Sequence, residues 1–168
     1  MIFKKADGTS TGDVAKYIKE YLAKQTHGEF KIFIGCDSLP PRKKVTTFAI
    51  VIVIYNVGKG GHVIHKRLPE SSREFRVMWN RLWREVELAV ATAMYIRDSK
   101  CLDIPKSRQK MIQVDFAGLH IDINPDKKWR SNEVFSAAIG YVKGMGFEYH
   151  AKPDAPAASY AADHICRM

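Results

Sequence analysis

Four acidic residues, Asp37, Glu87, Asp122 and Asp163, occur where carboxylates from distant parts of the chain can converge on one site. Asp37 closes the apolar run from Lys31 to Cys36. A buried, unpaired charge is costly, so an Asp at a strand end is usually paired, hydrogen-bonded or bound to a metal. Mg²⁺ prefers hard oxygen ligands. Two such ions bridged by carboxylates promote phosphodiester cleavage, and this is the chemistry that the four acids predict.

Each of these acids also has a simpler interpretation. Asp37 could start a turn with Ser38. Glu87 competes with Glu85 for the same role, and either could lie on a solvated helix face beside Arg84. The sequence leaves these alternatives open at this point.

Asp122 competes with two neighbours along the chain, Asp115 and Asp126. Asp115 lies inside the same apolar run but before Gly118, and Asp126 follows a proline and is typical of a turn. Asp122 has the strand-end position, which favours it for the site. Asp163 lies in a helix of small residues that can approach a sheet closely, and its alternative is a surface helix acid.

Hydrophobic periodicity predicts the elements that must position these acids. Residues 45–57 are rich in β-branched side chains on both alternating faces, which indicates a strand covered on both sides. Glycines between the second and third strands predict a hairpin, and Gly118 predicts a bend or bulge. We expect helices at 11–25, 72–97, 131–143 and 156–167, and strands at 31–36, 45–57, 62–68, 111–123 and 147–151. A helix followed by β-β-β-α-β-α-β-α predicts an α/β layered single domain, residues 1–168, with a mixed five-stranded sheet.

In this order of elements and acids, the chain resembles the ribonuclease H-like fold, and more closely the ribonuclease H-like YkuK family of bacteria. The segments that carry the resemblance cover most of the chain: Ile34-Gly-Cys-Asp-Ser38, the strand from His62 to Arg67, Leu119-His-Ile-Asp-Ile-Asn124, Ser131-Asn-Glu-Val134, Gly140-Tyr-Val-Lys-Gly-Met-Gly146, Lys152-Pro-Asp-Ala155 and Ala158-Ser-Tyr-Ala-Ala-Asp-His164. Cys36 departs from the threonine expected in the family, which should alter strand packing rather than metal binding.

The resemblance implies a three-layer ribonuclease H-like domain, preceded by an N-terminal helical extension at residues 1–28. It also implies acidic residues that bind Mg²⁺ or Mn²⁺. We expect Asp37 and Asp122 to hold both ions, and Glu87 and Asp163 to complete one each. Glu87 is preferred to Glu85 because, in ribonuclease H-like helices, the glutamate precedes an alanine-rich stretch such as the one from Glu87 to Ala93.

Basic and aromatic residues near the predicted site could contact a nucleic-acid backbone or stack on a base. The candidates for substrate binding are Arg42, Lys43, Lys128, Trp129, Arg130 and Lys152. Solvated loop cations are the simpler interpretation. His120 lies two residues before Asp122, and a lone His beside a sheet is more often packed and hydrogen-bonded. No nucleophile motif accompanies it.

Composition agrees with a basic, globular protein. The chain has 168 residues, 46% of them hydrophobic, and a formal net charge of +9, which attracts phosphate backbones. Three cysteines without a Cys-x-x-Cys pair predict reduced thiols rather than a disulfide framework or zinc site. No apolar run is long enough to span a bilayer, and no signal peptide is evident, so we expect a cytoplasmic protein. The oligomeric state is left open.

The predicted function is hydrolysis of phosphodiester bonds in RNA, an RNA–DNA hybrid or structured DNA by a two-metal mechanism. One rival is a nucleic-acid-binding module that keeps the fold but has little or no catalysis. Another is a structural protein whose acids form a hydrogen-bonded network. Fold by itself does not choose among them.

Overall fold

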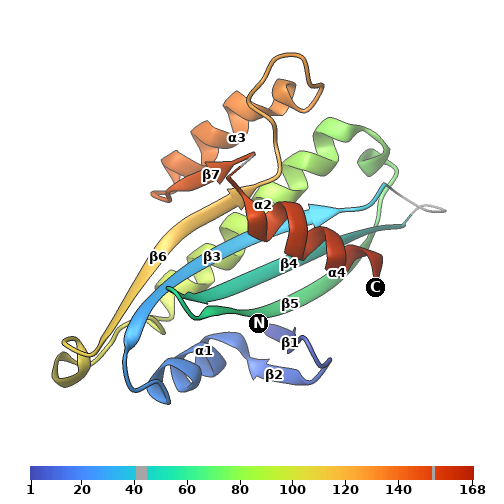
Figure 1. Ribbon diagram of the computed structural model, residues 1–168. Coiled ribbons are helices and arrows are strands. Elements are labelled where there is room, and N and C mark those ends of the chain that lie inside the picture. The colour runs from blue at the N-terminus through green and yellow to red at the C-terminus, as the bar shows by residue number, and fades with distance from the viewer. Residues whose placement is uncertain (41–44, 153) are drawn as a thin grey trace.

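A computed structural model of the chain describes residues 1–40, 45–152 and 154–168. These residues build one mixed sheet with the strand order β2-β1-β5-β4-β3-β6-β7, covered by helices on both faces (Figure 1). The predicted α/β class and three-layer arrangement are confirmed. The sheet has seven strands rather than the expected five.

The two additional strands come from the N-terminal segment, which is more than the helical extension we expected. β1 (Ile2–Lys5) and β2 (Ser10–Asp13) form a hairpin that precedes α1 (Val14–Ala23). β1 pairs antiparallel with β5, with Lys4 opposite His65. Asp13 caps α1, since its carboxylate accepts a hydrogen bond from the Lys16 N–H at 3.1 Å. The segment is therefore built into the sheet.

The central strands follow the predicted order. β3 (Gly28–Ser38), β4 (Val45–Asn56) and β5 (Gly60–Ser71) form an antiparallel meander, in which β4 is buried along most of its length. β6 (Ile112–Ile121) runs parallel to β3, and the short β7 (Tyr149–Ala151) runs parallel to β6. The carboxyl ends of β3 and β6 thus meet at one edge of the sheet.

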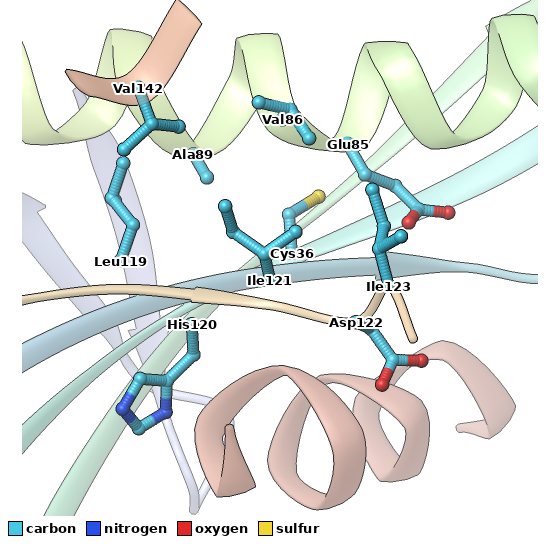
Figure 2. A pocket seen from close by; sticks show the side chains of 10 residues that line it. All are labelled: Cys36, Glu85, Val86, Ala89, Leu119, His120, Ile121, Asp122, Ile123 and Val142. Carbon is cyan, nitrogen blue, oxygen red and sulfur yellow. The ribbon is translucent and has the colours of Figure 1, made fainter. Parts of the chain in front are cut away.

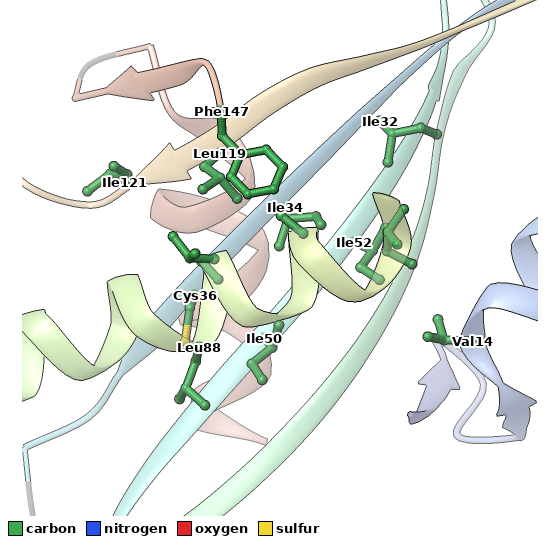
Figure 3. Packing of buried hydrophobic residues seen from close by; sticks show 14 of the residues in the cluster. Val14, Ile32, Ile34, Cys36, Ile50, Ile52, Leu88, Leu119, Ile121 and Phe147 are labelled. Atoms are coloured by element: carbon green, nitrogen blue, oxygen red, sulfur yellow. The ribbon is translucent and has the colours of Figure 1, made fainter. Parts of the chain in front are cut away.

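Helices cover the two faces unequally. α1, α2 (Met78–Asp98) and α3 (Asn132–Gly144) pack on one face and bury the larger core. Figure 3 shows α2 lying over part of this core. The π-helix η3 (Ala157–Ala162) and α4 (Asp163–Arg167) cross the other face and bury a smaller core with Ala49 and Val51. Two short 3₁₀ turns, η1 (Glu74–Arg76) and η2 (Lys106–Arg108), complete the fold. None of the described helices is both long and apolar enough to cross a membrane.

A bulge in β6 changes which side chains face which core. The register with β3 pairs Ile32 with Phe116 and Phe33 with Gly118, so one residue of β6 is skipped. Phe116 packs against the larger core before the bulge, and Leu119 packs against it after the bulge. Gly118 has φ +123°, a backbone conformation that glycine readily adopts. The bend predicted at Gly118 is confirmed, and every side chain after it changes face.

Candidate active site

Asp37 and Asp122 lie at the carboxyl ends of neighbouring parallel strands. The last paired residues of β3 and β6 are Cys36 and Ile121, and each Asp follows directly. Cys36 and Ile121 face the larger core, so alternation places both Asp residues on the face that η3 and α4 cover. Neighbouring strands are about 5 Å apart. Figure 2 shows the Asp122 carboxylate directed toward this C-terminal helix. The sequence prediction that these acids are neighbours is consistent with this geometry.

Glu85, and not Glu87, approaches them from the opposite face. Glu85 is only 5% exposed, and its Oε1 accepts a hydrogen bond of 2.6 Å from the Ser38 hydroxyl. It lines the same small pocket as Asp122 (Figure 2). The two glutamates are two residues apart and therefore point about 200° apart around the helix.

Glu87 lies on another side of α2. Its carboxylate accepts hydrogen bonds from Trp83 Nε1 at 3.0 Å and from Arg84 Nη1 at 3.2 Å. The structure thus places Glu85, rather than the preferred Glu87, beside the other acids. The spacing of the buried residues along α2 favours Glu85, because Glu85 follows Leu82 by three residues and precedes Ala89 by four.

Asp163 is the first residue of α4 and reaches the site from the helix that crosses the sheet. Its carboxylate accepts hydrogen bonds from Arg167 Nε at 2.9 and 3.0 Å, and the Arg167 Nη2 lies 2.8 Å away. Its negative charge is one of the causes that raise the pKa of Asp37. Asp163 thus belongs to the cluster electrostatically while an arginine balances its charge.

Lys152 contributes a second cation to the cluster. Its Nζ lies 2.9 Å from Asp122 Oδ1, and the Asp122 side chain is only 16% exposed. Lys152 was predicted as a substrate contact, and the structure places it on an acid of the candidate site. A phosphate contact from Lys152 remains a prediction.

Crowding of negative charge shifts the titration of the buried acids. The pKa of Asp37 is raised to about 6, chiefly by burial and then by the charge of Asp122, although the Ser38 N–H and Lys152 oppose the shift. Burial and the charge of Asp37 hold the pKa of Glu85 well above its usual range. The carboxylates therefore repel one another, and a bound cation would relieve that repulsion.

The donor set fits a hard divalent ion, although its atoms are not gathered into a preformed cage. Asp37, Glu85, Asp122 and Asp163 offer only carboxylate oxygens, the ligands preferred by Mg²⁺ and Mn²⁺. Within the described ranges, no three His, Cys, Asp or Glu side chains are grouped closely enough to hold an ion. The Lys152 ammonium would compete with an ion for Asp122 Oδ1.

The competing acids have structural roles. Asp126 accepts the Lys128 N–H at 3.0 Å and pairs with the Lys128 ammonium, as expected of a turn residue. Asp115 is exposed on β6, seven residues before Asp122 and so roughly 20 Å away along the strand. Neither acid joins the cluster.

His120 holds the start of the C-terminal helix. Its Nδ1 accepts the Ala157 N–H at 2.9 Å, and its ring lies 4.4 Å from the Phe33 ring. Burial, and then the nearby His150, lower the pKa of His120 to about 4, so the ring is neutral at pH 7. The predicted packed and hydrogen-bonded role is confirmed.

Three of the other predicted substrate contacts, Lys128, Trp129 and Arg130, lie in the loop after β6. Arg42 and Lys43 lie outside the described residues. Trp129 is 53% exposed in the loop after β6, and the Lys128 ammonium lies 5.8 Å from its ring centre. Arg130 lies exposed in the same loop. Stacking or phosphate contacts from this loop remain predictions.

The sequence interpretation missed Ser38 as a partner of the site. Ser38 was considered only as a turn residue, yet its hydroxyl holds Glu85 and its N–H donates to Asp37 Oδ1 at 2.8 Å. Strand alternation could have shown that Ser38 faces α2 while Asp37 faces the other way. Cys36, Cys101 and Cys166 are all free and buried.

A mixed sheet with acids at the ends of β3 and β6, and on helices of both faces, defines the ribonuclease H-like class of proteins. The family profile described as Ribonuclease H-like matches residues 13–167. The chain therefore belongs to this family, which is the YkuK-type family. Comparisons with curated proteins and with solved structures gave no match. The family supports a nuclease or a nucleic-acid-binding module in general terms.

Proposed function

We propose that this protein is a nuclease that hydrolyses phosphodiester bonds in RNA, RNA–DNA hybrid or structured DNA, with Mg²⁺ or Mn²⁺ as cofactor. The observation that carries the proposal is the placement of Asp37 and Asp122 at the carboxyl ends of the neighbouring parallel strands β3 and β6, with Glu85 beside them on α2. The raised pKa of Asp37, due to burial and to the charge of Asp122, agrees with this crowding of carboxylates. Like-charged groups are seldom gathered without a compensating cation, and perturbed carboxylates of this kind cluster at functional sites.

Each acid has a distinct part in the proposal. Asp37 and Asp122 would each contact both ions, because they lie side by side on neighbouring strands. Glu85 would contact one ion from the α2 side, and Asp163 would contact the other from α4. Divalent ions in such a site supply Lewis-acid chemistry that activates water and stabilises the leaving oxygen.

The remaining residues orient these carboxylates. Ser38 fixes the Glu85 carboxylate through its hydroxyl, and its backbone N–H fixes the Asp37 carboxylate. Lys152 and Arg167 balance the charges of Asp122 and Asp163 while no ion is bound. In the metal-bound protein, the Lys152 ammonium would be available to a substrate phosphate.

A second candidate is a nucleic-acid-binding module with little or no catalysis. The ion pairs of Lys152 with Asp122 and of Arg167 with Asp163 favour it, since built-in cations can stabilise an acid cluster without metal. In such a module, these two ion pairs would persist whether or not a divalent ion is present.

One experiment separates these functions. Labelled RNA–DNA hybrid, RNA and branched DNA are incubated with the protein and with Asp37→Asn, with and without Mn²⁺. Metal-dependent cleavage that Asp37→Asn abolishes supports the nuclease. Binding without cleavage supports the module, and the absence of both overturns the two together.

A further inference from the structure

Two grooves on the α4 side of the sheet meet beside the acid cluster. The first is lined by Thr47, Arg67 and Arg167 among others, and the second by Lys4, His65 and Arg67. Arg67 and Met168 line both, so the two grooves are continuous. They form a path from the end of α4 across β5 to β1.

The sheet register places this path next to the candidate active site. Asp37 pairs with Ala49 on β4, and Ala49 pairs with Arg67 on β5, so the three lie in one cross-strand row. Paired residues point to the same face, which puts Arg67 on the face of Asp37 at a separation of about 10 Å between Cα atoms. His65 and Lys4 are paired with each other on the same face, two residues further along β5.

The cations on this path are available to an anion. Lys4 and Arg67 are both exposed, and no ion pair joins either of them to a carboxylate in the part of the chain that the structure describes. Asp7 is an acid that lines the second groove. The path therefore presents free positive charge on a chain whose net charge is +9.

His65 gives a second, independent indication of a ligand. It lies between the two cations, is only 6% exposed, and its buried Nδ1 has no hydrogen-bond partner among the described residues. Burial, and then the charges of Lys4 and Arg67, lower the pKa of His65. An unpaired buried nitrogen costs free energy of folding, and a bound anion would offset both this cost and the repulsion between the cations.

We propose that Arg67, His65 and Lys4 form a track for the sugar–phosphate backbone of a nucleic acid, leading from the acid cluster across β5 to the N-terminal hairpin. The proposal rests on the proposed function for the identity of the polyanion. Arg67 lies in the same cross-strand row as Asp37, two strands away, so phosphates next to one held at Arg67 would reach the acids. The track also explains why β1 is joined to the edge of the sheet, since β1 supplies Lys4.

The test measures binding separately from cleavage. Fluorescence anisotropy with a labelled RNA–DNA hybrid and a labelled single-stranded RNA is recorded in EDTA at several salt concentrations. We expect the double variant Lys4→Gln with Arg67→Gln to weaken binding about 10- to 100-fold near 0.1 M salt. The slope of log affinity against log salt should fall by about 2, because each phosphate contact contributes roughly 0.9.

A matched control removes two charges elsewhere. Lys19 on α1 and Lys24, the residue that caps its C-terminal end, are exposed, and α1 packs against the larger core on the opposite face of the sheet. Lys19→Gln with Lys24→Gln should change affinity less than about threefold. Equal effects of the two double variants would overturn the track. Arg67→Glu is the second variant, and its reversed charge should weaken binding more than Arg67→Gln does.

Cleavage with Mn²⁺ and the sedimentation mass, measured on the same variants, distinguish the proposed track from the proposed nuclease. Binding that depends on Lys4 and Arg67, in a protein that cleaves nothing with Mn²⁺, would retain the track and overturn the nuclease. Cleavage together with unchanged binding in the double variant would retain the nuclease and overturn the track. If the double variant changes only the sedimentation mass, the path is an interface between copies of this chain, and the track is also overturned.

Discussion

Gly118 lies on β6, four residues before Asp122, which follows the strand, and the bulge at Gly118 turns the Asp122 carboxylate to the face of Asp37. Without the skipped residue, alternation would direct Asp122 toward α2, into the larger core. A backbone irregularity thus brings the two acids together.

The first prediction concerns that bulge. A Cβ at position 118 would lie 2.8 Å from the Glu148 carbonyl oxygen, and the φ of +123° is unfavourable for any residue with a side chain. Gly118→Ala should therefore lower the free energy of unfolding by about 2–4 kcal/mol, as measured by urea denaturation. It should also weaken Mn²⁺ binding. A variant of unchanged stability would show that the bulge tolerates a side chain.

The second prediction separates the two glutamates of α2. Glu85→Gln should lower metal-dependent cleavage by at least about 100-fold, because a metal-ligating carboxylate is lost. Glu87→Gln should keep activity within about threefold, because Glu87 contacts Trp83 and Arg84 instead. Single-turnover cleavage rates measure both. The reverse ranking would restore the sequence-based preference for Glu87.

The third prediction concerns the charge of Asp37 in metal-free protein. The folded pKa of about 6 lies above the usual 3.8, so the folded state holds the proton more tightly, and stability falls as the pH rises from about 4 to 6. Asp37→Asn cannot ionise and can still accept the Ser38 N–H. It should raise the free energy of unfolding at pH 7 by about 1–2 kcal/mol while abolishing cleavage.

Denaturation in EDTA at pH 4 and pH 7 measures this effect, and the difference between the two proteins should be small at pH 4. Greater stability combined with lost activity is the expected mark of a functional acid. A destabilised Asp37→Asn protein would instead indicate a structural carboxylate.

The fourth prediction concerns metal binding itself. An ion that binds only the folded state at about 100 times its Kd adds about 2.7 kcal/mol of stability, or roughly 5–10 °C in Tm for a chain of this size. Mn²⁺ should therefore raise Tm in the unaltered protein but not in Asp122→Asn. Differential scanning calorimetry measures the shift. Equal shifts in both proteins would place the ion elsewhere.

The fifth prediction concerns His120, which holds the start of the C-terminal helix. His120→Leu leaves the Ala157 N–H without an acceptor at a buried position and should cost about 1–3 kcal/mol. His120→Asn retains an acceptor near Nδ1 and should recover part of the loss. Hydrogen exchange over residues 157–167 should accelerate most in His120→Leu. Equal exchange in both variants would show that the hydrogen bond does not hold this helix.

The sequence by itself indicated the order of the central elements and three of the clustered acids, Asp37, Asp122 and Asp163. The β-branched run of β4, the glycine turn before β5 and the apolar stripe of α2 depend on local periodicity, which is readable along the chain. Asp37 and Asp122 were identifiable because a charge at the end of an apolar strand requires a partner. The ribonuclease H-like class followed from this order and is confirmed by the family match.

Tertiary structure decided what local periodicity could not. The spacing of the buried residues on α2 already favoured Glu85, but only packing against β3 brought its carboxylate to Ser38, while Glu87 contacts Trp83 and Arg84. The N-terminal hairpin joined the sheet because β1 pairs with β5, a contact between residues some 60 positions apart in the chain. Ser38 and Lys152 also contact acids that are distant in the chain, Glu85 and Asp122. The pair of Arg167 with Asp163 is instead local to one helix. Non-local contacts set which faces meet, and no window of sequence contains both partners.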